Sequence, residues 1–255
     1  MAEILDYPVL VFAISFVGLW LAAWLGAFLS RKRLVVHENL RDDFGVILAA
    51  TLTLLGLIIG FSFSMATGRY DQRKNLEEAE ANAIGTEYVR VELLPAANAA
   101  KARALLTRYL GERILNYSTR DLDKVREIDT RTARLQAELW SAIRAPALAN
   151  PTPVMALVVS GMNDVLNSQS YTQAAWWNRI PHAAWILMAA IAFCCNVLAG
   201  YRAHDFKKEA VLLLVLPLVV SISFFLVADI DSPRAGLIRV KPQNLMSLAE
   251  SLRAP

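Results

Sequence analysis

The sequence predicts an all-α membrane protein with four transmembrane helices in two hairpins and a helical extramembrane domain inserted between spans two and three. Hydrophobic residues make up 56% of the 255-residue chain and are gathered in long runs. Four runs reach the roughly 20 residues that a helix needs to cross a bilayer, namely Pro8–Ser30, Phe44–Met65, Ile180–Gly200 and Ala210–Ala228. No strand-like alternation of apolar and polar residues competes with this interpretation.

These runs divide the chain into four parts. Residues 1–68 are predicted to form the first transmembrane hairpin, and residues 69–179 a helical extramembrane domain that continues span two. Residues 180–228 form the second hairpin, and residues 229–255 a polar tail. We expect the amphipathic end of this tail to dock on the extramembrane domain or on a neighbouring subunit.

The first span is predicted to remain in the protein as an anchor. A secretory signal has a positive segment before its apolar run and a small-residue cleavage site after it. Here no basic residue precedes the run, and Arg31-Lys32-Arg33 follows it. The adjacent Cys194 and Cys195 lie inside span three, where we expect small apolar residues and not a disulfide.

Flanking charges do not fix the orientation of the spans. The loops after spans one and three carry seven bases near the membrane: Arg31, Lys32, Arg33, Arg41, Arg202, Lys207 and Lys208. The opposite side also carries seven: Arg69, Arg73, Lys74, Arg179, Arg234, Arg239 and Lys241. The positive-inside rule, applied to the first hairpin, favours a cytoplasmic position for the short loops. The number of basic residues is nevertheless equal on the two sides.

Two adjacent faces run along span two. One carries a small residue at every fourth position, a spacing that lets another helix approach closely: Gly56, Gly60, Ser64 and Gly68. The other, turned by one residue, carries Thr53, Leu57 and Phe61. We expect the first face to pack against a helix.

The charged stretch after span two is predicted to remain helical, because apolar residues recur on one face and nothing breaks the pattern before Pro95. Its run of Glu77, Glu78 and Glu80 could bind a cation, but we expect it to form a solvated face and not a metal site. Three further helices are predicted over Ala99–Tyr117, Asp121–Ile143 and Val154–Ser170. Ser118 or Thr119 could cap the second of these, and Thr152 with Pro153 opens the third.

The sequence lacks the common catalytic and cofactor motifs. There is no P-loop, GxSxG elbow, CxxC, HExxH or GxGxxG before a helix. The three histidines, His37, His182 and His204, lack metal-ligand spacing. A net charge of +3 gives no reason to expect nucleic acid. We therefore expect no catalytic residue, cofactor or metal. The absence of acidic residues within the spans argues against a pump, leaving a passive pore or a structural role.

One stretch of the chain resembles a known family. Gly60-Phe61, Arg69-Tyr70-Asp71-Gln72 and Asn75-Leu76 are similar to the second transmembrane helix of bestrophins, where a Gly-Phe pair precedes Arg-Trp, a Gln and Asn-Leu. Residues 69–95 and 178–188 look like those of a bacterial bestrophin-like family. The layout agrees as well, with two spans, a large helical insert and two spans.

The resemblance implies a homopentameric ion channel, with the bilayer, other copies of the chain and inorganic ions as partners. The second helices would surround the axis and form an apolar neck, which here falls on Thr53, Leu57 and Phe61. A ring of Leu57 and Phe61 could gate by dewetting. Thr53 stands where the family has an apolar residue, so the neck would be shorter and wetter there. The acidic calcium clasp of animal bestrophins has no counterpart here.

The same resemblance implies that the charged continuation lines or flanks the vestibule of the pore, through Arg69, Arg73, Glu77 and Glu80. It also implies a multi-pass protein of the bacterial inner membrane with the insert on the cytoplasmic side. Neither a basic nor an acidic ring identifies the ion. The alternative is a non-conducting membrane scaffold or sensor whose helical domain binds a partner.

Overall fold

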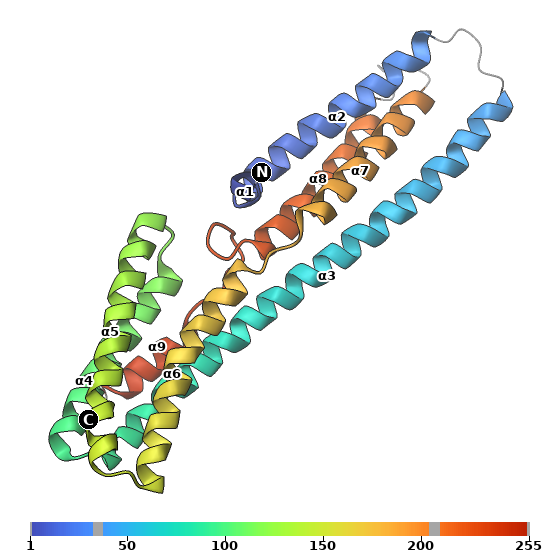
Figure 1. The fold of residues 1–255 in the computed structure, drawn as a ribbon. Coiled ribbons are helices and arrows are strands. Elements are labelled where there is room, and N and C mark those ends of the chain that lie inside the picture. The colour runs from blue at the N-terminus through green and yellow to red at the C-terminus, as the bar shows by residue number, and fades with distance from the viewer. Residues whose placement is uncertain (1, 33–37, 204–209, 254–255) are drawn as a thin grey trace. The chain divides into compact units, whose positions relative to one another are not determined.

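A computed structural model describes residues 2–32, 38–203 and 210–253, and within these ranges every regular element is a helix (Figure 1). The elements are α1 (Ala2–Leu5), α2 (Pro8–Lys32), α3 (Glu38–Arg90), a 3₁₀ turn (Val91–Leu93), α4 (Ala96–Ser118), α5 (Leu122–Ala149), α6 (Pro153–Trp177), α7 (His182–Arg202), α8 (Ala210–Asp231) and α9 (Gln243–Ser251). The predicted all-α class is confirmed. Four helical segments are long and apolar enough to cross a membrane: Pro8–Ser30, Phe44–Leu93, Pro153–Arg202 and Leu213–Asp231.

Internal contacts divide the chain into two compact units. The first, which we call the apolar unit, consists of Met1–Arg69 and Arg179–Arg239. The second, the polar unit, consists of Tyr70–Asn178 and Val240–Pro255. Helix α3 contributes to both units, and the tail that follows α8 is divided between them.

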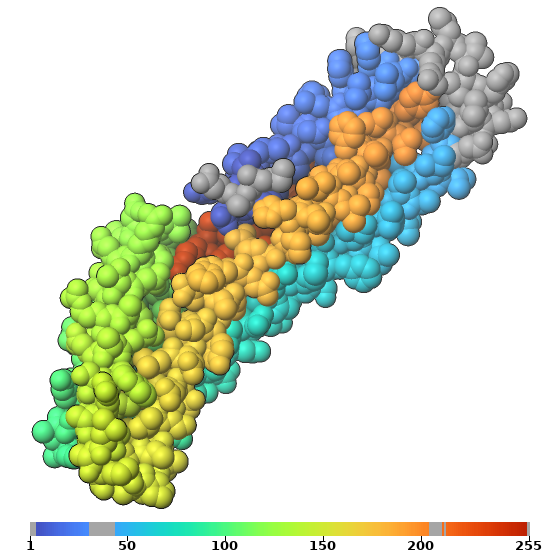
Figure 2. Space-filling model, viewed as in Figure 1, coloured from blue at the N-terminus to red at the C-terminus, as the bar shows by residue number. Residues whose placement is uncertain are grey.

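Within the apolar unit, α2 packs closely on α7 through two glycines. A Cβ added to Gly26 would collide with the carbonyl oxygen of Val197, and one added to Gly200 would collide with that of Ala23. Side chains of α2 and α7 lie against each other in the space-filling view (Figure 2). Small residues of this kind let two transmembrane backbones approach, so the glycine pair sets the spacing of this crossing.

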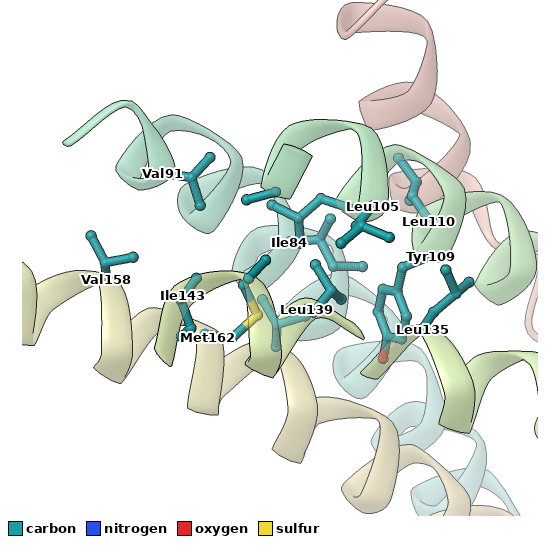
Figure 3. Close-up of a cluster of buried hydrophobic side chains, with 14 of the residues drawn as sticks. Ile84, Val91, Leu105, Tyr109, Leu110, Leu135, Leu139, Ile143, Val158 and Met162 are labelled. Carbon is teal, nitrogen blue, oxygen red and sulfur yellow. The ribbon is translucent and has the colours of Figure 1, made fainter. Parts of the chain in front are cut away.

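The polar unit is a helical bundle around its own apolar core. The amphipathic faces of α4, α5 and α6 converge with the last turns of α3, and α9 adds Leu245 to the cluster. Figure 3 shows Ile84, Tyr109, Leu139 and Met162 meeting in its centre, and all four are fully buried. Side chains of this size each contribute roughly 1.5–3 kcal/mol on burial, so the core accounts for much of the unit's stability.

Local signals fix two helix starts in this unit. The hydroxyl of Thr152 accepts a hydrogen bond from the backbone N–H of Met155 at 3.2 Å, with Pro153 in the first turn, as predicted. At α5 the prediction of Ser118 or Thr119 was wrong, because Asp121 is the N-cap and its carboxylate accepts from the backbone N–H of Asp123 at 3.0 Å. Helix α5 also continues to Ala149, past the predicted end, with Pro146 inside it.

Candidate functional site

The predicted neck residues lie on an open face of α3. Leu57 is 53% exposed and Phe61 is 62% exposed. Thr53 is also exposed, and its hydroxyl donates to the carbonyl oxygen of Ala49 in the same helix at 2.9 Å. Its hydrogen-bonding capacity is thus partly used within the helix. This face presents two large apolar side chains and one hydroxyl, and no group that could act as an acid or base.

The small-residue strip on the neighbouring face also has no neighbour within the described chain. A Cβ added to Gly56, Gly60 or Gly68 would meet no atom within 4 Å, and Ser64 is exposed. By contrast, Leu55, Ser62 and Ala66 on another side of α3 are buried. Helix α3 therefore packs within its own chain through one side and leaves both predicted faces free for lipid or for another molecule.

The four predicted vestibule residues have different surroundings. A guanidinium nitrogen of Arg69 lies 3.8 Å from a carboxylate oxygen of Asp231 inside the apolar unit. Arg73, Glu77 and Glu80 belong to the polar unit and are almost completely buried. The two glutamates are each engaged in hydrogen bonds within that unit. In the single chain, these charges hold the helical domain together.

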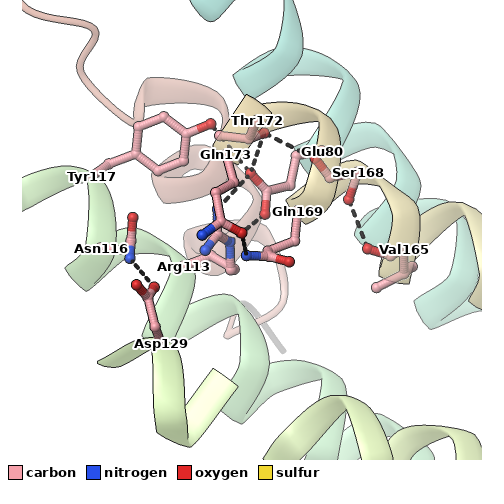
Figure 4. A network of polar contacts seen from close by, with 10 residues as sticks. All are labelled: Glu80, Arg113, Asn116, Tyr117, Asp129, Val165, Ser168, Gln169, Thr172 and Gln173. Carbon is pink, nitrogen blue, oxygen red and sulfur yellow. Dashed lines mark hydrogen bonds and ion pairs between the residues drawn. The ribbon is translucent and has the colours of Figure 1, made fainter. Parts of the chain in front are cut away.

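Glu80 is the centre of a buried polar network (Figure 4). Arg113 donates to both of its carboxylate oxygens. The hydroxyls of Tyr117 and Thr172 donate to Oε2 at 3.2 and 3.3 Å. Burial, followed by the charge of Glu80, raises the pKa of Tyr117 above its ordinary value, which favours the protonated phenol that donates this hydrogen bond. Glu80 on α3 thereby joins α4 and α6.

Glu77 holds the start of α9. Its Oε1 accepts from the backbone N–H of Leu245 at 3.0 Å, and its Oε2 accepts from the side-chain amide of Asn244 at 2.7 Å. A carboxylate at the first turn of a helix satisfies a backbone donor and is favoured by the helix dipole. Of the two docking positions expected for the tail, α9 takes the one on its own chain, within the polar unit.

Glu87 on α3 is a buried carboxylate that no sequence pattern marked, and its environment is unusual. Neither of its carboxylate oxygens has a hydrogen-bond partner among the described residues. The nearest glycine is Gly161 on α6, where an added Cβ would collide with Glu87 and would lie 2.7 Å from a guanidinium nitrogen of Arg90. Burial raises the pKa of Glu87 to about 8, against the attraction of Arg90 and with a contribution from Asp164. Glu87 can therefore hold a proton near neutral pH.

A second polar cluster lies in the apolar unit, at the end of α8. Asp231 accepts from the Nε of Arg179 at 2.9 Å and from the backbone N–H of Ile180 at 3.2 Å. Arg179 also donates to Asp6 at 2.6 Å. Asp229 accepts from the backbone N–H groups of Leu237 and Ile238 at 2.7 and 2.8 Å. The polar residues at this end therefore tie together the starts of α2 and α7 and the end of α8.

No metal centre is visible in the described part of the chain, where no three His, Cys, Asp or Glu side chains are grouped to bind an ion. His37 and His204 lie outside the described residues. The arrangement around α3 offers exposed surfaces and buried charges.

Comparison with known proteins gives a consistent result. Residues 12–245 match the Bestrophin-like domain family. No curated protein matches the chain. The fold is similar to crystal structures of a bacterial bestrophin homologue from Klebsiella pneumoniae carrying point substitutions. One has a TM-score of 0.61 at 12% identity, over 96% of this chain and 97% of that one. Another has a TM-score of 0.60 at 13% identity, over 94% and 97%. At these identities the likeness concerns the fold.

Proposed function

Because this chain belongs to the bestrophin-like family, we propose that it forms a passive ion channel in which several copies place α3 around a common axis. The resemblance to bestrophins suggests five copies, in the inner membrane of a bacterium with the polar unit in the cytoplasm. In this proposal ions cross through a pore lined by α3.

The observation that carries the proposal is the unpartnered glycine strip of α3. Exposed leucine and phenylalanine on a transmembrane helix are compatible with lipid contact alone. A regular strip of small residues is different, because it leaves a groove that lipid fills poorly and that another helix fills well. A Cβ at Gly56 or Gly60 would meet nothing within 4 Å in the single chain. We infer that the neighbouring subunit occupies this groove.

Packing through that strip would turn the adjacent face toward the axis. Leu57 and Phe61 would then form rings that narrow the pore and exclude water when closed. Thr53 would give a more polar end to this neck. The buried state of Glu77 and Glu80 supports a flanking role, in which they hold the polar unit around the end of α3 and do not contact ions.

Ion flux from liposomes containing the purified protein tests this function. Leu57→Ala and Phe61→Ala should each increase leak, because a smaller ring dewets less readily. Phe193→Ala is the matched control, since Phe193 is also an exposed phenylalanine but lies on α7 and on neither face of α3. The assignment of the neck would be wrong if all three variants leaked ions equally, or if none of them leaked more than the wild type. An intact oligomer without flux would favour the scaffold or sensor alternative.

Native mass spectrometry of the same preparation tests the assembly. The proposal requires a closed oligomer, because a single α3 cannot enclose a pore. A monomer or dimer in a bilayer-like environment would contradict it. A reporter fused after Arg120, in the turn between α4 and α5, would show on which side of the membrane the polar unit lies.

A further inference from the structure

The polar unit contains a pocket of about 470 Å³ that the channel proposal does not use. It lies between one face of α4, one face of α5 and the chain segment after α9. Its charged lining consists of four arginines and one glutamate: Arg108, Arg131, Arg134, Arg253 and Glu112. The formal charge of this lining is therefore +3, from four positive charges and one negative charge.

Helical spacing explains how these side chains meet. On α4, Arg108 and Glu112 are one turn apart, and on α5, Arg131 and Arg134 are three residues apart. Residues three or four apart share a helix face. Helices α4 and α5 pack together, and Arg253 follows the last turn of α9. Three separate parts of the chain thus bring guanidinium groups to one concavity.

Only one of these arginines is neutralised. The Nε of Arg131 donates to Glu112 at 2.9 Å, and another nitrogen lies 3.9 Å from Glu127. The side chains of Arg108, Arg134 and Arg253 are exposed and have no hydrogen bond or ion pair among the described residues. A concave site lined by like charges focuses a field that attracts the opposite charge. The charge of this lining would suit an anion with several charges.

We propose that this pocket binds a ligand carrying two or more phosphate groups. A guanidinium binds phosphate through paired, charge-assisted hydrogen bonds, and three unpaired arginines match a group with at least as many negative charges. The pocket volume falls within the roughly 300–1,000 Å³ of small-molecule sites. The space beside Gly111 is open, since a Cβ added there would meet nothing within 4 Å. Either a soluble oligophosphate or a lipid headgroup has this chemistry.

Titration calorimetry with inorganic tripolyphosphate tests the proposal on the full chain in phosphatidylcholine nanodiscs. We expect saturable binding that the double variant Arg108→Gln/Arg134→Gln weakens by roughly tenfold or more, the effect of losing charge-assisted bonds. The matched control is Arg120→Gln/Arg144→Gln, which removes the same charge from exposed positions outside the pocket. This control should change the affinity by less than about twofold, because separated surface charges are screened.

A variant that fills the pocket and a second probe show whether binding occurs in this pocket and which ligand it takes. Gly111→Leu fills the pocket without changing its charge, and it should also abolish binding. Nanodiscs containing cardiolipin, which has two phosphates, distinguish the sources. If cardiolipin alone binds and the Arg108/Arg134 variant loses it, the ligand is a lipid headgroup. Saturable tripolyphosphate binding with the same loss identifies a soluble ligand. Absence of saturable binding by either probe, or equal weakening in the control variant, overturns the proposal.

Discussion

The Nε of Arg179 lies 2.9 Å from the Oδ2 of Asp231, although more than fifty residues of chain separate them. The carboxylate of Asp231 is only 3% exposed and also accepts from the backbone N–H of Ile180. A second guanidinium, that of Arg69, lies 3.8 Å away. Asp231 is therefore the common partner through which the end of α8 holds the start of α7 and a residue of α3.

Replacing this carboxylate should destabilise the apolar unit. Asp231→Asn keeps the size of the side chain but leaves Arg179 without its buried anionic partner. We expect a loss of about 2 kcal/mol, below the full value for a buried pair because Arg179 is partly exposed. The unfolding midpoint in a detergent titration measures this loss. Asp6→Asn is the control, because Asp6 is 45% exposed and should have little effect. Equal midpoints for the two variants would contradict the central role of Asp231.

The Glu80–Arg113 pair gives a second prediction, for the polar unit. Arg113→Leu would leave Glu80 buried with its charge uncompensated, and such a change costs about 3–5 kcal/mol. The double variant Glu80→Gln/Arg113→Leu should recover part of this loss, because no charge is left unpaired. Thermal unfolding of the full chain in detergent, followed by tryptophan fluorescence, measures both variants.

The control for this pair is Arg126→Leu. Arg126 forms its ion pair with Asp123 on the open surface of α5, where both side chains are more than three-quarters exposed. Solvent-exposed pairs contribute little to stability, so this variant should unfold like the wild type. A double variant as unstable as Arg113→Leu alone would show that packing, and not the unpaired charge, dominates at this site.

The third prediction concerns pH and Glu87. The folded-state pKa of about 8 lies above the ordinary value of 4.5, so the folded protein holds this proton more tightly than the unfolded chain does. The associated stability is complete at low pH and is lost as the pH rises toward 8. The unfolding temperature should therefore fall between about pH 5 and pH 8.

Glu87→Gln tests this dependence because glutamine stays neutral at every pH. The variant should flatten the fall in unfolding temperature and should be more stable than the wild type at the alkaline end. Glu78→Gln, at an exposed position of the same helix, should leave the slope unchanged. An unchanged slope in the Glu87 variant would assign the pH dependence to other groups.

Features encoded within one helix could be predicted from the sequence. The apolar runs predicted four long apolar helices, and Thr152 with Pro153 marked the start of α6, because capping depends on adjacent residues. The continuation of α5 past Ile143 was missed, since its end is set by packing and Pro146 is accommodated inside the helix. The repeat of apolar residues along α5 ends at Ile143, but the helix continues to Ala149 and Pro146 is buried.

Features that depend on two distant segments could not be predicted. Nothing in the sequence distinguishes Gly26 and Gly200 from other glycines. Their role follows from the crossing of α2 and α7, which brings each against a carbonyl oxygen. No sequence pattern marks Glu87, and its burial depends on the absence of a side chain at Gly161. Glu77 and Glu80 were assigned to a solvated face, but α9 and α4 supply partners that no local pattern reveals.

The last prediction compares one substitution at two kinds of glycine. Gly200→Ile would force α2 and α7 apart and should cost at least the roughly 1–3 kcal/mol of an overpacked core, seen as a lower unfolding temperature. Gly60→Ile has open space in the single chain, so the subunit should fold normally. If a neighbouring subunit occupies the strip on α3, this variant should instead lose the oligomer, which native mass spectrometry detects. An intact oligomer with isoleucine at position 60 would place the strip against lipid and remove the main support for an axial α3.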